Sequence, residues 1–229
     1  MRWFALLFLM AAGPTVAQTI ISAELVEPTD RYDHAILGDA LEWGALQVTL
    51  SDGQKRRFRL PETHVFEDVT ARLADVDGDG TSEVIVVETD MARGASLAIY
   101  GPSGKIAATA PIGQTHRWLA PAGWGDFDGD GRVEIAYIDR PHLAKELVLV
   151  RLKNGALSEV LRLKGLTNHQ IGDAVIHGGP QECARRLGLF LANSNWTRGK
   201  WVQVIGTKVS VFDVGPIRRP SDLDRLSCP

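Results

Sequence analysis

The sequence predicts an all-β protein built from repeated units. Three observations support this prediction: short runs of residues typical of strands, tight-turn dipeptides between them, and an acidic loop that occurs twice. The acidic loops lie about 51 residues apart, and the turns repeat with nearly the same period. The turns are Asp52-Gly53, Ser103-Gly104, Asn154-Gly155 and Gly206-Thr207. Two independent patterns therefore give the same unit length.

Each turn joins two strand-like runs. These are GALQVTL with KRRFRLP, SLAIY with KIAATAPI, ELVLVRL with ALSEVLRL, and WVQVI with KVSVFDV. With two further strands before each hairpin, every unit contains four strands, which is the composition of a propeller blade. We therefore expect a small β-propeller-like array of about four four-stranded antiparallel blades over residues 18–215. A closed ring, an open stack of blades and a pairing of two chains are all compatible with this pattern.

The first and last units are expected to differ from the middle two. Unit one runs from Ile20 to Leu60, with ISAELV as its inner strand and DHAILGD as its second strand. Its loop EPTDRYD keeps scattered acids but lacks the glycines and the ligand spacing. Unit four begins near His169, and its loop HGGPQECARR has no carboxylate cluster. The acidic loops therefore belong to units two and three.

The two acidic loops are DVDGDGTSE, from Asp75 to Glu83, and DFDGDGRVE, from Asp126 to Glu134. Carboxylates at alternate positions would repel one another without a cation. Calcium takes about six to eight oxygen ligands, and a curled loop brings alternate carboxylates to one point. The predicted ligands are Asp75, Asp77, Asp79, the carbonyl of Thr81 and Glu83 in the first loop, and Asp126, Asp128, Asp130, the carbonyl of Arg132 and Glu134 in the second.

Neither loop is an EF-hand, because Val86 and Tyr137 stand at the twelfth position, where that motif has a bidentate Glu. The glycines between the acids permit the positive φ angles that a tight curl requires. The alternative is an acidic, glycine-rich hairpin connection that needs no ion. The repetition of the same ligand spacing favours two structural calcium sites.

The N-terminus has the features of a secretory signal. Arg2 precedes the apolar run WFALLFLMAAG and the small residues that end at Ala17, so residues 1–17 are expected to be cleaved. The apolar run is too short to span a bilayer, and a buried first helix is the alternative. The net charge is −3, with no basic excess to favour nucleic acid. We therefore expect a periplasmic or secreted protein without membrane insertion after cleavage.

The chain has two cysteines, Cys183 and Cys228. A disulfide between them is plausible in an exported protein and would tether the C-terminal tail, residues 216–229, to unit four. Two free thiols are the alternative.

Three histidines occupy equivalent places at the expected starts of inner strands: His64, His116 and His169. In a propeller they would surround the central channel on the face opposite the calcium loops. They could hold a transition metal or another ligand there, or cap the strands through hydrogen bonds to the backbone. The sequence contains no GxSxG, HExxH or CxxC motif, so it gives no direct sign of catalysis.

The DxDGDGxxE loops, together with AGWG before Asp126, resemble FG-GAP repeats, also called VCBS repeats, of the integrin alpha-subunit propeller kind. The resemblance covers about residues 62–164. It implies that each loop joins an inner strand to a second strand and binds a structural calcium ion through the ten residues named above. Integrin propellers have seven blades, whereas this chain has material for about four.

The expected function is that of an exported, calcium-binding FG-GAP/VCBS repeat protein. It would act as a non-catalytic binding or scaffold module for a protein or glycan partner. The alternative is a secreted enzyme, or a transition-metal-binding protein, that uses the histidine-lined face.

Overall fold

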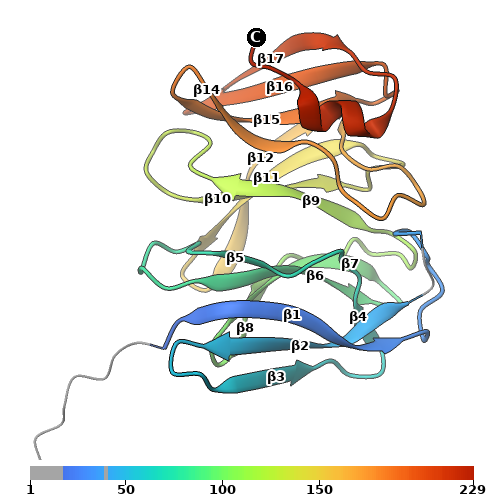
Figure 1. Ribbon diagram of the computed structural model, residues 1–229, viewed down its shortest axis with the longest axis vertical. Helices are drawn as coiled ribbons and strands as arrows, with labels where there is room; N and C mark the ends of the chain where they lie inside the picture. Colours follow the sequence, from blue (N-terminus) through green and yellow to red (C-terminus); the bar gives the residue numbers. More distant parts are fainter. Residues whose placement is uncertain (1–17, 39–40) are drawn as a thin grey trace, which may run out of the picture.

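The computed structural model describes residues 18–38 and 41–229 and shows an all-β chain of antiparallel sheets, as predicted. Its strands form layers that follow one another in chain order along the long axis (Figure 1). The first and last layers lie at opposite ends of this axis, so the described chain is an open stack of layers. The predicted signal peptide, residues 1–17, lies outside the described residues.

The first layer consists of β1 (Ile20–Thr29), β2 (Glu42–Leu50) and β3 (Lys55–Arg59). The hairpin between β2 and β3 turns at Asp52-Gly53, as predicted. The prediction of a second strand at DHAILGD was wrong, because the described part of that segment forms no strand. Tyr32 and Ile36 are instead buried against later layers, a long-range effect that a local strand pattern does not reveal.

The second layer has an interrupted inner strand. β4 pairs with both β2 and β6, which joins the first two layers into one eight-stranded sheet. The interruption places two buried acids, Glu67 and Asp68, between the two pieces, where Asp68 accepts a hydrogen bond from the Val87 amide at 2.9 Å. The strands are β4 (His64–Phe66), β5 (Arg72–Ala74), β6 (Glu83–Asp90), β7 (Gly94–Gly101) and β8 (Gly104–Ala108).

The third layer is the four-stranded blade that the sequence predicts, with its strands in the order β9-β10-β11-β12. They are β9 (Leu119–Gly125), β10 (Glu134–Asp139), β11 (Glu146–Lys153) and β12 (Ala156–Lys164).

The fourth layer is a five-stranded sheet. Within the predicted loop HGGPQECARR, Gly179–Cys183 in fact form strand β14, and Ala184 and Arg185 form the turn that follows it. The strands are β13 (Leu166–Thr167), β14 (Gly179–Cys183), β15 (Arg186–Asn193), β16 (Arg198–Ile205) and β17 (Lys208–Pro216).

The C-terminal tail packs on the fourth layer. It contains the 3-10 helix η1 (Pro220–Arg225), and Ile217 and Leu223 are buried. Cys183 and Cys228 form the expected disulfide, with a Cα–Cα distance of 5.5 Å. No helix among the described residues has the length and hydropathy needed to cross a bilayer.

The core lies between the layers. Strand β6 reads EVIVVETD and is buried from Glu83 to Thr89, because layers cover it on both faces. Its side chains divide between two apolar clusters, with Ile85 and Val87 facing the third layer and Val84 and Val86 facing the first. Each fully buried valine or isoleucine contributes about 1.5–3 kcal/mol. The acidic loops therefore project from a rigid scaffold.

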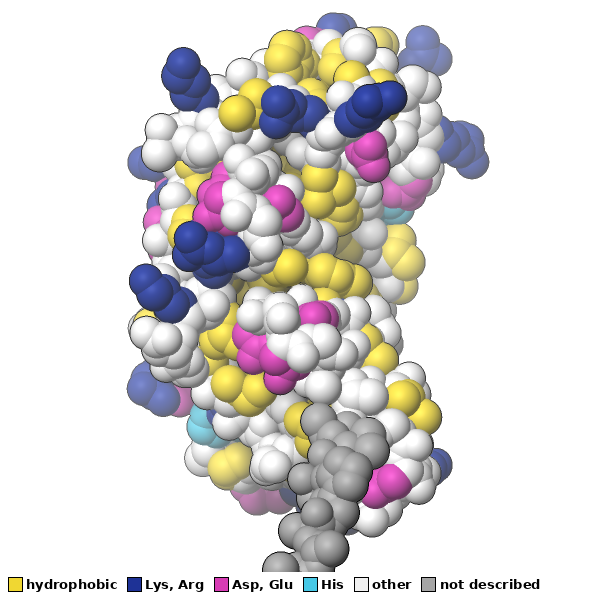
Figure 2. All heavy atoms as spheres, turned by 90° about the vertical axis from the view of Figure 1, so that its left-hand side faces the viewer, with side chains coloured by type: hydrophobic (Ala, Val, Ile, Leu, Met, Phe, Trp, Pro, Cys, Tyr) yellow, Lys and Arg dark blue, Asp and Glu magenta, His cyan; other side chains and the backbone are white. Residues whose placement is uncertain are grey.

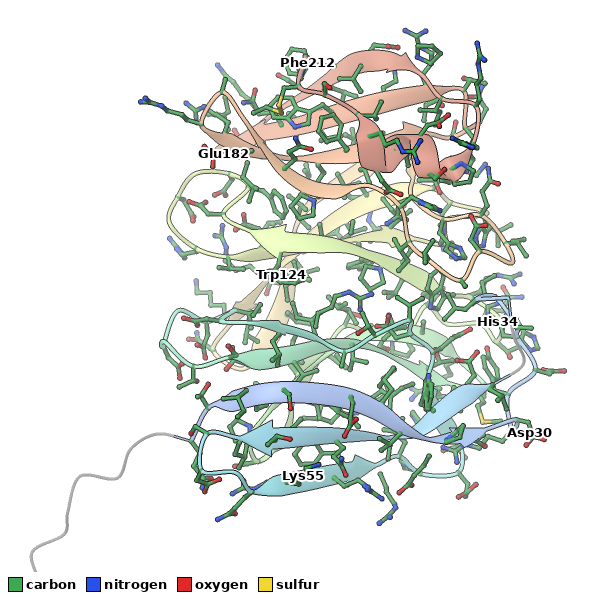
Figure 3. All side chains as sticks on the ribbon, in the orientation of Figure 1. Asp30, His34, Lys55, Trp124, Glu182 and Phe212 are labelled. Atoms are coloured by element: carbon green, nitrogen blue, oxygen red, sulfur yellow. A yellow bond between two sulfur atoms is a disulfide. The ribbon has the colours of Figure 1, made fainter. Side chains whose placement is uncertain are left out.

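The connection after β1, residues 30–38, runs along the edge of the stack (Figure 1). His34 lies on this edge, and its Nδ1 contacts Glu67 of the second layer (Figure 3). The Tyr32 hydroxyl accepts a hydrogen bond from the His116 amide at 2.8 Å, and the Ile36 carbonyl accepts one from the Gly172 amide at 3.2 Å. This connection therefore ties the first layer to segments of the later layers.

Candidate metal centre

Both acidic loops lie on the edge opposite the connection after β1. The first joins β5 to β6 and the second joins β9 to β10, so each links an inner strand to a second strand, as the resemblance implies. Figure 2 shows this face, with two groups of acidic side chains one above the other and hydrophobic side chains between them.

The first loop is curled by hydrogen bonds from its own backbone. The Asp75 carboxylate accepts hydrogen bonds from the amides of Gly78 at 2.8 Å and Gly80 at 3.0 Å. Gly78 and Gly80 have φ angles of 80° and 86°, which glycine adopts without steric cost. The alternation of acid and glycine thus folds the chain around the Asp75 side chain.

This curl brings together three of the predicted ligands, Asp75, Asp77 and Glu83, whose carboxylate oxygens lie within 4.8 Å of one another. Glu83 begins β6 and is only 3% exposed, and it accepts a hydrogen bond from the Val76 amide at 3.0 Å. Burial raises the pKa of Glu83 to about 7, and repulsion from neighbouring aspartates adds to the effect. A cation in the loop would stabilise the ionised form of this carboxyl group.

The remaining predicted ligands of the first loop do not belong to this group of carboxylates. Asp79 accepts hydrogen bonds from the Thr81 amide at 2.7 Å and the Thr81 hydroxyl at 2.6 Å. These bonds lower the pKa of Asp79 below its usual value.

The second loop repeats this backbone arrangement. The Asp126 carboxylate accepts hydrogen bonds from the amides of Gly129 at 2.8 Å and Gly131 at 3.0 Å. Asp126, Asp128 and Glu134 form the matching group, with oxygens within 4.8 Å of one another. In both loops the Glu at the ninth position thus lies in the group, and its side chain is buried.

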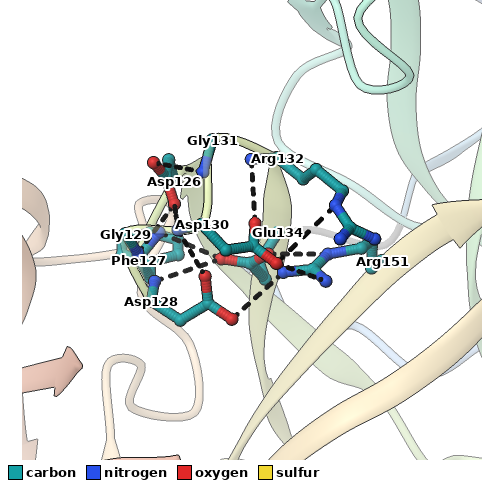
Figure 4. Close-up of polar contacts among 9 residues, drawn as sticks. All are labelled: Asp126, Phe127, Asp128, Gly129, Asp130, Gly131, Arg132, Glu134 and Arg151. Carbon is teal, nitrogen blue, oxygen red and sulfur yellow. Dashed lines mark hydrogen bonds and ion pairs between the residues drawn. The ribbon is translucent and has the colours of Figure 1, made fainter. Parts of the chain in front are cut away.

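The loops differ in one residue outside them, Arg151 on β11 (Figure 4). Its guanidinium group contacts the carboxylates of Asp128 at 3.1 Å, Asp130 at 3.0 Å and Glu134 at 2.8 Å. The Arg151 side chain is 14% exposed, and the Glu134 side chain is fully buried. Burial raises the pKa of Glu134, and the hydrogen bonds from Arg151 oppose this shift. The side chain of Arg132 makes only a longer contact with Asp130, at 3.6 Å, whereas its backbone amide donates a hydrogen bond to the Asp130 carboxylate at 3.0 Å.

Arg151 was not among the predicted site residues. Val84 lies opposite Tyr100 in the second layer, and Ile135 lies opposite Val150 in the third. One residue further along β7 and β11, Gly101 in the second layer and Arg151 in the third therefore occupy equivalent places. Alignment of SLAIYG with ELVLVR would have revealed this difference, although not where the arginine points.

The two loops fit a hard cation differently. In the first loop, only carboxylates converge, and no basic side chain of the described chain forms an ion pair with them. In the second loop, carboxylate oxygens of Asp128, Asp130 and Glu134 already pair with Arg151. A metal ion there would have to share these carboxylates with the guanidinium group or displace it.

The three predicted histidines have separate partners. His64 Nε2 lies 3.8 Å from the Asp90 carboxylate, and His116 Nε2 lies 2.9 Å from the Asp33 carboxylate. His169 Nδ1 lies 3.0 Å from Nε2 of His142. Only His64 begins a strand, so the prediction of equivalent inner-strand positions was wrong for His116 and His169. Equivalent positions in an open stack follow one another along an edge and do not surround a channel.

A cavity of about 30 Å³ lies among His34, His116, Trp118 and His142. Burial lowers the pKa of His142 to about 4, and repulsion from His169 adds to this effect. In each acidic loop, three carboxylates place oxygens within 4.8 Å of one another. Within the described residues, no three histidines bring their ring nitrogens this close together.

Comparison with known proteins supports the interpretation of the acidic loops. No curated protein matches the chain significantly. A solved structure of the rhamnogalacturonan lyase YesW is 11% identical, with a TM-score of 0.44, and the match covers 89% of this chain and 52% of the lyase chain. The chain thus spans about half the length of that structure. Residues 75–137 match the FG-GAP-like repeat family, which confirms the resemblance over a segment that contains both acidic loops.

Proposed function

We propose that this protein is an exported, calcium-binding, non-catalytic module that presents a rigid β-stack to a protein or glycan partner. The observation that carries the proposal is the convergence of Asp75, Asp77 and the buried Glu83 in the first acidic loop. Three carboxylates so close together are mutually repulsive, and one of them is shielded from water. A divalent cation offsets both effects.

The ligand chemistry favours calcium among common cations. The converging groups offer only oxygen, which suits calcium and magnesium, whereas zinc in proteins usually has histidine or cysteine ligands. Calcium also accepts irregular coordination, and backbone carbonyls and water can complete its shell. Magnesium demands near-ideal octahedral geometry, which carboxylates fixed by a short curled loop are less able to provide.

The position of the first loop favours a structural role for the ion. The loop leads directly into β6, which is buried from Glu83 to Thr89. An ion held by Asp75, Asp77 and Glu83 would fasten the start of this strand to the end of β5. Such a fixed connection supports constitutive occupancy and does not favour a sensor that changes shape.

Export is supported by the disulfide between Cys183 and Cys228, because such bonds persist mainly in oxidising compartments. This agrees with the expected signal peptide at residues 1–17 and with a periplasmic or extracellular location. The alternative, a secreted enzyme or transition-metal protein, would need His64, His116 and His169 to act together, and their contacts lie with separate partners.

Thermal unfolding with millimolar calcium, with equimolar magnesium and with chelator tests the calcium proposal. We expect calcium to raise the melting temperature well above the value in chelator, and magnesium to have a much smaller effect. Identical melting in calcium and chelator would overturn the proposal.

The binding role is tested by affinity capture from the native envelope extract with the immobilised protein. Asp77→Asn serves as the matched control, because it removes one negative charge from the calcium ligands and conserves the shape of the side chain. We expect a partner to be retained in calcium and released in chelator, and retention by Asp77→Asn to be weaker. Saturable binding of a purified candidate then has to reproduce this pattern, and its failure to do so would count against the module.

A further inference from the structure

The two acidic loops have the same backbone design but different neighbours. We infer that the guanidinium group of Arg151 takes the place of a metal ion in the second loop, so that calcium binding is confined to the first loop. This inference rests on the proposed function only in assigning the ion to Asp75, Asp77 and Glu83.

The contacts of Arg151 are those expected of an internal cation. One guanidinium group reaches three carboxylates, with Nη2 on Asp128, Nη1 on Asp130 and Nε on Glu134. A planar guanidinium group has five N–H donors and can serve several oxygens at fixed angles. Its charge therefore offsets the same mutual repulsion that a calcium ion would offset.

The burial of this arrangement makes displacement costly. Arg151 projects from β11, which pairs with β10 on one side and β12 on the other, so its backbone is fixed. Its side chain is 14% exposed, and the side chain of Glu134 is fully buried. A calcium ion that entered the loop would place a second positive group beside Arg151, or force the guanidinium group away from its partners.

The first loop has no such group. The residue at the matching place in the strand register is Gly101, which has no side chain. The next residue back, Tyr100, donates its hydroxyl hydrogen bond to Glu88 at 2.7 Å, and Lys105 pairs with Glu88 at 2.7 Å. In the described part of the second layer, these polar groups thus serve Glu88 and not the acidic loop.

The test is the number of calcium ions bound per chain, measured by isothermal titration calorimetry or equilibrium dialysis on the full-length exported protein. We expect one ion for the unmodified protein, none for Asp77→Ala and one for Asp128→Ala, because alanine removes the ligand oxygen that asparagine would keep. Arg151→Ala frees the second loop and is expected to bind one ion more than the unmodified protein. Arg151→Lys, the matched control that keeps a positive charge, is expected to gain none.

The outcomes separate this inference from the proposed function. Two ions on the unmodified protein, with one lost in Asp128→Ala, would overturn the inference and leave calcium binding intact. No ion on the unmodified protein but one on Arg151→Ala would refute calcium at the first loop and support the role of Arg151. An unchanged count in folded Arg151→Ala would overturn the inference. Should that variant fail to fold by circular dichroism, the comparison of Asp77→Ala with Asp128→Ala decides.

Discussion

The first acidic loop collects carboxylates alone, whereas the second closes the same curl of backbone around an arginine. Asp75 and Asp126 accept equivalent hydrogen bonds from two glycine amides, and Glu83 and Glu134 are both buried at the ninth position. The difference comes from the strand opposite, where one layer has Gly101 and the other has Arg151. A loop motif therefore specifies the arrangement of its acids, and the neighbouring strand decides whether an arginine reaches them.

The largest effect is expected for Arg151→Ala in the presence of chelator. Its free energy of unfolding should fall by about 3–5 kcal/mol, because Glu134 stays buried without its partner. Urea denaturation measures this loss, and millimolar calcium should restore part of it. Arg132→Ala is the control, since the Arg132 side chain is 63% exposed, and it should change stability by less than about 1 kcal/mol. Equal losses of stability in Arg151→Ala and Arg132→Ala would contradict the special role of Arg151 in the second loop.

Cys228→Ser separates general stability from the chemistry of the loops. Loss of the disulfide should reduce the free energy of unfolding by about 3–4 kcal/mol in the chain-entropy model. The shift that calcium causes in the melting temperature should stay the same, because the disulfide belongs to the fourth layer. A weakened calcium response in this variant would show that the first loop depends on the far end of the stack.

Calcium removal should distinguish the loops directly. At a free calcium concentration 100 times the dissociation constant, the ion contributes about 2.7 kcal/mol. Asp77→Ala should abolish this contribution, whereas Asp128→Ala should lower the baseline stability and keep the full calcium response. Both variants are measured by thermal unfolding with and without chelator. A lost response in both would mean that the two loops are equivalent.

The same substitution at the ninth position should have opposite signs in the two loops. In calcium-free protein at pH 8, Glu83→Gln should raise the free energy of unfolding by about 1–2 kcal/mol, because it removes a buried charge. Glu134→Gln should lower it, because Arg151 loses an ionised partner.

The pH dependence follows from the raised pKa of Glu83. The folded-state pKa of about 7 lies above the ordinary value of 4.5, so the folded chain holds an extra proton between these pH values. The stability of the calcium-free protein should therefore fall as the pH rises from about 4.5 to 7. Urea denaturation across this range should show a flatter profile for Glu83→Gln, and parallel profiles would contradict the assignment.

The repeated part of this architecture could be predicted from the sequence because its signals are local. The turns at Asp52-Gly53 and Asn154-Gly155, and the two acidic loops, are each encoded within a few residues. The pairing of Cys183 with Cys228 followed from the presence of only two cysteines. The order of strands in the third layer then follows from hairpin connections.

The features that escaped prediction depend on contacts between distant segments. DHAILGD has the alternation of a strand, yet Ile36 is buried against later layers and not in a sheet. The sequence of β11 does not mark Arg151 as a site residue. Its role depends on which face of the sheet its side chain occupies. The predicted position of His116 and His169 around a central channel required the layers to close into a ring.

The connection after β1 has a consequence for how the protein reaches its native state. The Ile36 carbonyl bonds to the Gly172 amide, about 136 residues further along the chain. Contacts between segments so distant in sequence slow folding, because a long loop must close before they form. The connection after β1 can therefore reach its native contacts only after the segment around Gly172 has been made. The native contacts of this connection are therefore among the last that the chain can form.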